Sequence, residues 1–200
     1  MNDRHAAPTG AILAGGRALR FGGLPKGLEM VDGARIVDRV AAALGAVTGE
    51  LLLVGAPDAV AATLPQCRAV ADDAPGLGPL GAIITVLRAA RGDVLVVAWD
   101  MPFVTAGILS PLLDEPDDAD AVLWENDGYL EPLCGLYRAT ALGGLTAAFS
   151  AGDRGPREAL RRLQVRVLAH ASGDERSPFT SINTPDQLDA ARQPRARATR

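Results

Sequence analysis

Residues 11–28 read AILAGGRALRFGGLPKGL and contain the most informative pattern of the chain. Its first three residues are apolar and typical of a buried strand, and a loop rich in glycine and basic side chains follows them. Glycine lets backbone N–H groups approach a bound anion closely because it has no Cβ. The stretch therefore predicts a strand that leads into a loop able to bind a polyphosphate.

Three cations stand in this loop, Arg17, Arg20 and Lys26. Lys26 is the only lysine of the chain, beside 19 arginines. An ammonium is a compact point charge that suits a phosphate oxygen in a tight loop. The loop is not a Walker A motif, because Lys26 is preceded by Pro25 and followed by Gly27. We therefore interpret Lys26 as a phosphate-binding residue of another kind of loop.

Short apolar runs alternate with helical patterns after the loop. Residues 51–54 and 93–98 are predicted strands, and apolar positions at helical spacing predict a helix from about Ile36 to Gly45. Such alternation indicates an α/β protein with a mostly parallel sheet. Further on, residues 119–125 and 132–137 are predicted strands around an Asn-Asp-Gly triplet that favours a hairpin turn.

Asp100 follows the strongest strand signal, DVLVVA, and begins the segment DMPF. Ligands of open parallel sheets bind beyond the carboxyl ends of the strands. Mg²⁺ prefers oxygen ligands and typically takes one or two carboxylates together with substrate phosphates. Asp100 is therefore a candidate magnesium ligand.

A second glycine-rich segment allows a different interpretation. Gly76, Gly78 and Gly81 spell GxGxxG, and Asp100 lies 19 residues beyond Gly81, as in a dinucleotide-binding fingerprint. Pro79 inside the motif instead favours a glycine-rich turn into a helix that begins there. We take the turn as the main interpretation, and the turn can still border a nucleotide.

The composition limits the class of protein. The chain has 200 residues, 48% of them apolar, with a net charge of −4, which fits one globular domain and argues against binding nucleic acid. No run reaches the roughly 18 apolar residues of a spanning helix, and the amino-terminal residues lack the apolar core of a signal peptide. We expect a cytoplasmic protein without a membrane partner. Cys67 and Cys134 lie far apart without zinc-ligand spacing, and two buried thiols are expected there.

The glycine-rich stretch resembles the signature of the molybdenum cofactor guanylyltransferases, which are nucleotidyltransferases. The residues that match are Leu13, Ala14, Gly15, Gly16, Arg20, Gly22, Lys26 and Leu28. Phe21 departs from the methionine usual in that family, and both residues are apolar. The resemblance implies a GT-A-like fold, a three-layer α/β/α sandwich with a Rossmann-like, mostly parallel sheet.

From the length of the chain we expect a single domain over residues 1–191, and the arginine-rich residues 192–200 are expected to form a disordered tail. The nucleotide-binding half of this domain would span about residues 9–105 and its acceptor-binding half about residues 106–191.

The family's functional residues carry over by position. The resemblance implies that the backbone of Leu13, Ala14, Gly15 and Gly16 holds the nucleotide. Lys26 and Arg20 would bind the triphosphate, Asp100 would hold Mg²⁺, and Asp72 would contact the ribose or base. Lys26, Arg20 and Asp100 are thus the candidate catalytic residues.

The resemblance implies that the protein transfers GMP from GTP to the phosphate of molybdopterin, which carries molybdenum, and releases pyrophosphate. Asn183 and Arg157 are candidates for binding the acceptor. GTP and the molybdenum cofactor are the expected partners, and molybdoenzymes or their chaperones are further candidates.

Three alternatives stay open. Related nucleotidyltransferases on the same fold use CTP or a sugar 1-phosphate, although Gly16 favours the guanylyl branch because cytidylyl relatives usually read LAAG. From other classes, a non-catalytic GTP- or cofactor-binding adaptor would not need Asp100. An oxidoreductase built on Gly76–Gly81 would bind a nicotinamide dinucleotide without Lys26.

Overall fold

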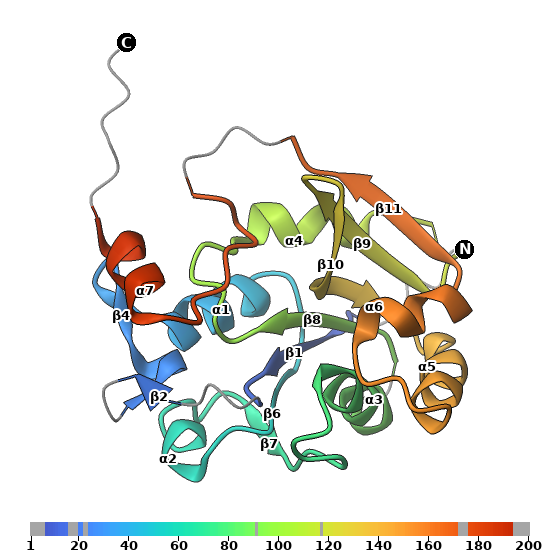
Figure 1. The fold of residues 1–200 in the computed structure, drawn as a ribbon, viewed down its shortest axis with the longest axis horizontal. Coiled ribbons are helices and arrows are strands. Elements are labelled where there is room, and N and C mark those ends of the chain that lie inside the picture. Colours follow the sequence, from blue (N-terminus) through green and yellow to red (C-terminus); the bar gives the residue numbers. More distant parts are fainter. Residues whose placement is uncertain are drawn as a thin grey trace.

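The structure is a computed structural model that describes residues 7–15, 20–21, 24–90, 92–116, 118–171 and 176–193. Within these ranges the chain forms a seven-stranded sheet and two short two-stranded ribbons (Figure 1). Across the sheet the strands follow the order β11 (Val165–Ala169), β9 (Ala121–Asn126), β10 (Tyr129–Tyr137), β8 (Val94–Ala98), β1 (Thr9–Leu13), β6 (Leu51–Val54) and β7 (Arg68–Val70).

Strand β10 runs antiparallel to both of its neighbours in the sheet, β8 and β9. The other paired strands of the sheet are parallel. The prediction of a mostly parallel sheet is therefore confirmed. Because β1, β6, β7 and β8 point the same way, the segments that follow them meet at one edge of the sheet.

Helices cover both faces of the sheet. Figure 1 shows α1 (Ile36–Gly45) and α4 (Ala106–Leu113) on one side of strands β8 and β1, with α3 (Pro79–Ala89) and α5 (Ala141–Ser150) on the other. The remaining helical segments are α2 (Asp58–Ala61), α6 (Pro156–Ala159), α7 (Pro185–Arg192) and the 3-10 turns η1 (Lys26–Leu28) and η2 (Leu160–Arg162). In the described ranges, no helix is both long and apolar enough to cross a membrane.

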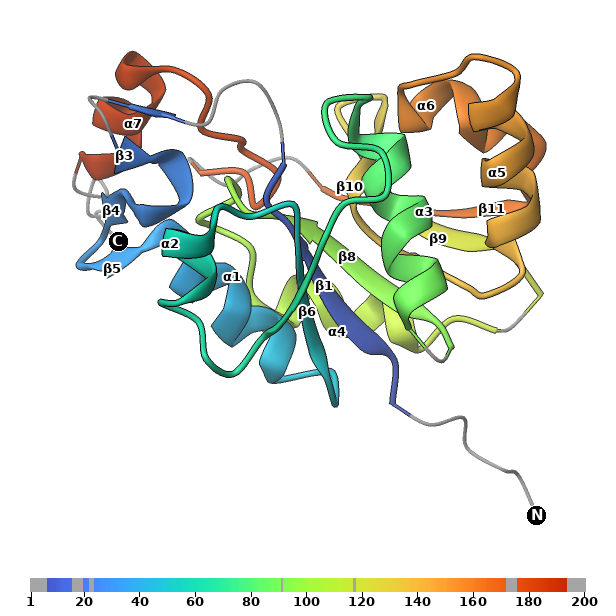
Figure 2. The same ribbon diagram turned by 90° about the horizontal axis from the view of Figure 1, so that it is seen from below.

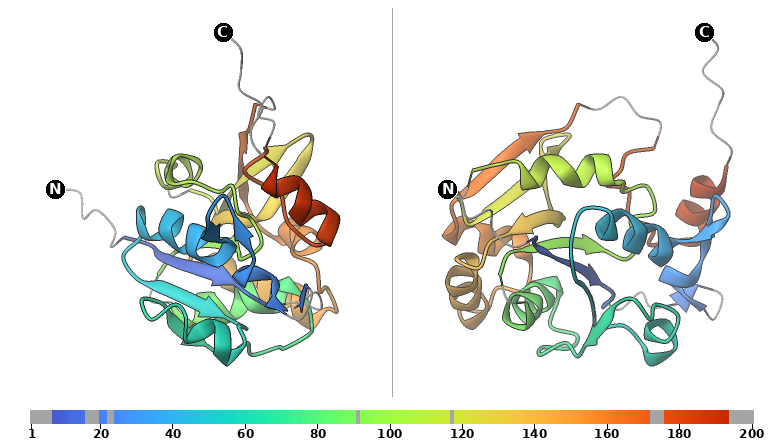
Figure 3. Two further views of the ribbon diagram at one scale, coloured as in Figure 1. Left: turned by 90° about the vertical axis from the view of Figure 1, so that its left-hand side faces the viewer. Right: turned by 180° about the vertical axis from the view of Figure 1, so that it is seen from behind.

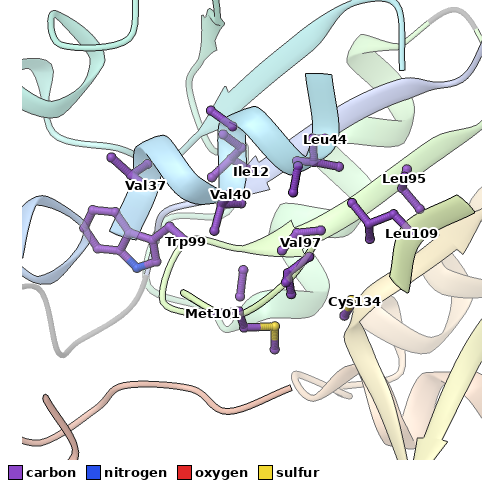
Figure 4. Close-up of a cluster of buried hydrophobic side chains, with 14 of the residues drawn as sticks. Ile12, Val37, Val40, Leu44, Leu95, Val97, Trp99, Met101, Leu109 and Cys134 are labelled. Atoms are coloured by element: carbon purple, nitrogen blue, oxygen red, sulfur yellow. The ribbon is translucent and has the colours of Figure 1, made fainter. Parts of the chain in front are cut away.

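The alternation of side chains along β1 builds the two cores. Ile12 packs with residues of α1 and α4, whereas Ala11 and Leu13 pack with residues of α3 and α5. Figure 4 shows the first of these cores, with Ile12 beside Val40 of α1. Since β1 is buried on both faces, it reads as a continuous apolar run. The expected three-layer α/β/α arrangement is confirmed.

The predicted hairpin forms between β9 and β10. Asp127 and Gly128 have φ of 52° and 79°, and Asn126 pairs with Tyr129. Two successive positive φ angles are those of a type I′ turn, which matches the twist of paired strands.

Near its end the chain returns to its amino-terminal part. Helix α7 packs beside the ribbon of β4 (Met30–Val31) and β5 (Ala34–Arg35), and Figure 3 shows the red helix next to the blue strands. Their shared core contains Val31, Ile36, Ile182, Leu188 and Ala191. Helix α7 extends one residue into the predicted tail, and residues 194–200 lie outside the described ranges.

Candidate active site

The end of β1 lies in the middle of the carboxyl edge of the sheet. The Ala14 amide donates to the Val54 carbonyl at 2.9 Å, and the Trp99 amide donates to the Leu13 carbonyl at 3.1 Å. These bonds fix β1 between β6 and β8, so Gly15 emerges, exposed, at the centre of this edge. Figure 2 shows the end of β1 between α7 with β3 (Leu24–Pro25) on one side and the start of α3 on the other.

Lys26 and Asp100 form a buried ion pair at this edge. The Lys26 Nζ atom donates to Asp100 Oδ2 at 2.5 Å, and the two residues are 6% and 7% exposed. The structure thus brings together two residues that are 74 positions apart and that the sequence marked separately. Such a pair is sensitive to truncation, because removal of either partner leaves the other as an uncompensated buried charge.

The carboxylate of Asp100 is only half used by this pair. Its Oδ1 atom is buried and accepts no hydrogen bond within the part of the chain that the structure describes. A buried carboxylate oxygen without a partner is costly, so such an atom calls for an explanation such as an ion or a ligand.

Asn183 completes the cluster on the other side of the lysine. Its Oδ1 atom accepts from Lys26 Nζ at 2.9 Å, and the Ile182 amide next to it donates to the Asp100 carbonyl at 2.9 Å. The sequence suggested Asn183 as a contact to the acceptor, whereas its contact in the structure is to Lys26. The segment before α7 is therefore joined to both members of the ion pair.

A capping box holds Asn183 in place. Thr184 Oγ1 accepts from the Gln187 amide at 3.2 Å, and Gln187 Oε1 accepts from the Thr184 amide at 3.0 Å. The same Gln187 oxygen also accepts from the Asn183 amide at 2.7 Å. The start of α7 thus fixes the backbone of the residue that contacts Lys26.

Asp72 lies on the β7 side of the same edge. Its Oδ1 atom accepts from the Ala74 amide at 2.9 Å. Gly55, with φ of 69°, stands between Asp72 and the end of β1: a Cβ on Gly55 would lie 3.4 Å from Gly15 Cα and 3.8 Å from Asp72 Cβ. Gly55 is a residue that the sequence analysis did not single out, and this close approach was not predicted.

Thr85 is a second residue that sequence reasoning missed. This buried hydroxyl of α3 accepts from the Asp73 amide at 3.1 Å and lies 3.4 Å from Asp72 Oδ1. The sequence shows it as a polar residue within the apolar run of a helix. These hydrogen bonds of Thr85 order the loop that carries Asp72.

Arg157 is on α6, away from these contacts. Its Nη2 atom donates to the Leu130 carbonyl at 3.2 Å, and its guanidinium lies 5.7 Å from the centre of the exposed Tyr129 ring. None of the contacts found in the described ranges joins Arg157 to Lys26 or Asp100.

Two of the sequence candidates are not located by the structure. Gly16 lies outside the described residues, and for Arg20 only the backbone is described, in β2 (Arg20–Phe21), paired with Pro25 of β3.

The carboxyl edge of the sheet thus carries a glycine at a strand end, a buried ammonium and a buried carboxylate. These features are typical of an α/β protein that binds a phosphorylated ligand. Comparison with known families agrees with this class. Residues 10–167 match the model of the MobA-like NTP transferase domain. The chain belongs to this family of nucleotidyltransferases.

Individual relatives extend the match over most of the chain. A probable molybdenum cofactor guanylyltransferase of Chloroflexus aggregans (strain MD-66 / DSM 9485) is 37% identical over 171 residues, which cover 82% of this chain and 78% of that protein. The molybdenum cofactor guanylyltransferase of Pseudomonas syringae pv. syringae (strain B728a) is 31% identical over 178 residues, which cover 87% and 88%.

The fold also matches a solved structure. Molybdopterin-guanine dinucleotide biosynthesis protein A from Archaeoglobus fulgidus superposes with a TM-score of 0.75 at 28% identity, over 92% of this chain and 96% of that one. The resemblance and the nucleotidyltransferase fold expected from the sequence are confirmed.

Proposed function

We propose that this protein is a molybdenum cofactor guanylyltransferase, which transfers GMP from GTP to the terminal phosphate of molybdopterin and releases pyrophosphate. The observation that carries the proposal is the buried Lys26–Asp100 pair at the carboxyl edge of the sheet, in a chain whose relatives bear that name.

Different residues at the carboxyl edge bind different parts of the nucleotide. The backbone from Leu13 to Gly16 lies against the nucleoside, and Asp72 contacts the ribose or the base from the β7 side. Lys26 and Arg20 bind the triphosphate. The role of Lys26 is supported by the hydrogen bonds of its ammonium to Asp100 and Asn183, because the ammonium can exchange these oxygen partners for phosphate oxygens.

Asp100 is the residue that would hold Mg²⁺. The fit is supported by the Oδ1 atom, which is buried and accepts no hydrogen bond in the described part of the chain. Mg²⁺ commonly takes one or two carboxylates and completes its shell with phosphates and water. When bound, the metal supplies positive charge that stabilises the charge developing on the phosphates.

The transfer itself needs little proton chemistry. A phosphate oxygen of the acceptor attacks the α-phosphorus of GTP, a new P–O bond forms, and the bond between the α-phosphorus and the bridging oxygen breaks. Pyrophosphate leaves with the electron pair of that bond. Because the second pKa of a phosphomonoester is about 6, the attacking group is already mostly ionised and no general base is required. Positioning and charge neutralisation by Lys26 are the contributions of the protein.

The acceptor is the less constrained half of the proposal. Asn183, beside Lys26, and Arg157, on α6, are the candidate contacts of molybdopterin. The product would pass to molybdoenzymes or their chaperones.

The test is a substrate panel. Purified protein with Mg²⁺ is given GTP, CTP, UTP or ATP, each with molybdenum cofactor or a sugar 1-phosphate, and pyrophosphate release is measured. We expect turnover only with the pair of GTP and molybdenum cofactor. Turnover with another pair would reassign the substrate, and tight GTP binding without turnover of any pair would favour the non-catalytic adaptor.

A further inference from the structure

Trp99 and Gly27 are in close contact beside the ion pair. Trp99 is 1% exposed, and a Cβ on Gly27 would lie 2.4 Å from its Cε3 atom, 3.0 Å from Cζ3 and 3.1 Å from Cδ2. These three atoms belong to the six-membered ring of the indole. This ring therefore fills the space in which any other residue at position 27 would need its Cβ.

The positions of the two residues in the chain give the contact a meaning. Gly27 directly follows Lys26, and Trp99 directly precedes Asp100. The indole ring therefore lies between the backbone of Gly27 and the backbone of Trp99, and each of these residues adjoins one member of the Lys26–Asp100 ion pair. Trp99 is itself held from two sides, by the hydrogen bond that its backbone amide donates to the Leu13 carbonyl and by the core around Val37 and Val40 (Figure 4).

Two of the side-chain contacts of Lys26 are to Asp100 and Asn183. Its carbonyl accepts from the Glu29 amide at 3.2 Å. Lys26 stands at the start of the single turn η1, and no side chain caps that turn. When a triphosphate replaces Asp100 and Asn183 as its partner, the side-chain bonds that now hold Lys26 are lost, whereas the contact between the ring and Gly27 stays.

We propose that Trp99 is a positioning residue, whose ring, packed on Gly27, sets the place of the Lys26 ammonium relative to Asp100 and a bound triphosphate. The assignment rests on the nucleotidyl transfer proposed above. A misplacement of about 1 Å at a reacting centre costs on the order of 10²-fold in rate, so a contact that sets this place has a large effect on turnover.

A pair of complementary substitutions tests the assignment. Gly27→Ala pushes η1 away from the ring, and we expect kcat/KM for GTP to fall about 10- to 100-fold. Trp99→Phe replaces the indole by a smaller aromatic ring, which stays in the core but fills less of the space beside Gly27. In the double variant the new methyl group occupies the vacated space, so we expect kcat/KM to rise above that of Gly27→Ala by about 10-fold.

Gly10→Ala is the matched control for plain overpacking. A Cβ on Gly10 would lie 2.7 Å from both Leu51 Cδ2 and Thr48 Oγ1, but Gly10 stands near the start of β1, at the opposite end of the strand from the site. We expect this variant to unfold at a lower temperature while the folded enzyme keeps its kcat/KM within about 2-fold.

Binding of GTP with Mg²⁺ is measured by calorimetry on all four variants. This measurement tests the role of Trp99 independently of the proposed nucleotidyl transfer. We expect the Kd to rise in Gly27→Ala and to recover in the double variant. Equal losses in Gly27→Ala and Gly10→Ala after correction for the folded fraction, or no recovery in the double variant, would overturn the role of Trp99. A wild-type protein that turns over no substrate pair would refute the proposed function, and the binding data would still decide the role of Trp99.

Discussion

At the scale of single residues, Lys26 has two proposed roles, and both depend on its positive charge. In the proposed function it supplies positive charge to a triphosphate, and in the structure its Nζ atom donates to Asp100 Oδ2. Lys26→Met keeps the length of the side chain and removes the charge. We expect turnover to fall about 10²- to 10³-fold, the usual cost of losing one charge-stabilising donor.

The same variant has the opposite effect on metal binding. In Lys26→Met the Asp100 carboxylate loses its cationic partner, so Mn²⁺ added without nucleotide finds an unpaired anion. We expect the Kd for Mn²⁺ alone, measured by electron paramagnetic resonance, to be lower than in the wild type. An unchanged Kd would show that Asp100 is not the residue that receives the metal.

Residue types and strand ends were enough to predict the members of this cluster but not its contacts. Lys26 stood out as the only lysine, and Asp100 as a carboxylate after a buried strand. The bond from Lys26 to Asn183 joins residues 157 positions apart, and no local pattern encodes such a distance. The contact of Asn183 with Lys26 could therefore not be predicted, and its contact with the acceptor stays a prediction.

At the scale of elements, the start of α7 offers a direct comparison of two helix caps. The Thr184 side chain accepts a capping bond, whereas Thr105 is the N-cap residue of α4 without one. We expect Thr184→Ala to lower the free energy of unfolding by about 1 kcal/mol and Thr105→Ala to change it by much less. Urea denaturation measures both.

The cap also affects the site. Because Gln187 binds the Asn183 amide as well as the Thr184 amide, loosening the cap frees the residue that contacts Lys26. We expect Thr184→Ala to lower kcat/KM for GTP several-fold, and Thr105→Ala to leave it unchanged. Equal activity in the two variants would mean that α7 does not position Asn183.

Most elements of the sheet and its helices could be predicted, because apolar runs and helical spacing are local signals. The runs at 51–54 and 36–45 became β6 and α1. The docking of α7 on β4 could not be predicted in this way. It depends on a small core shared by the two ends of the chain, and neither end shows that core by itself.

At the scale of the whole molecule, the two thiols report on different depths of the fold. Burial raises the pKa of Cys134, in the inner strand β10, to about 12, and also raises the pKa of the half-buried Cys67. The thiolate is the reactive form, so a raised pKa slows labelling at pH 8. We expect a disulfide reagent to label Cys67 slowly and Cys134 only when the sheet unfolds.

Stepwise addition of denaturant checks this expectation. Labelling of Cys134 in a Cys67→Ser variant should follow the global unfolding curve, because opening of β10 breaks its pairing with both β8 and β9. Rapid labelling of Cys134 in the native protein would show that this part of the sheet opens locally.

We propose that the Lys26–Asp100 pair is the catalytic centre of guanylyl transfer, and a comparison of two aspartates tests this proposal. Asp93 forms a partly buried ion pair with Arg138 at 2.9 Å and precedes β8, whereas Asp100 follows that strand. The measurement is the rate at which wild type, Asp100→Asn and Asp93→Asn form the guanine dinucleotide product from GTP and molybdopterin with Mg²⁺. We expect Asp100→Asn to lose at least about 10²-fold and Asp93→Asn to lose stability but not rate. Equal rates for Asp100→Asn and the wild type would contradict the claim.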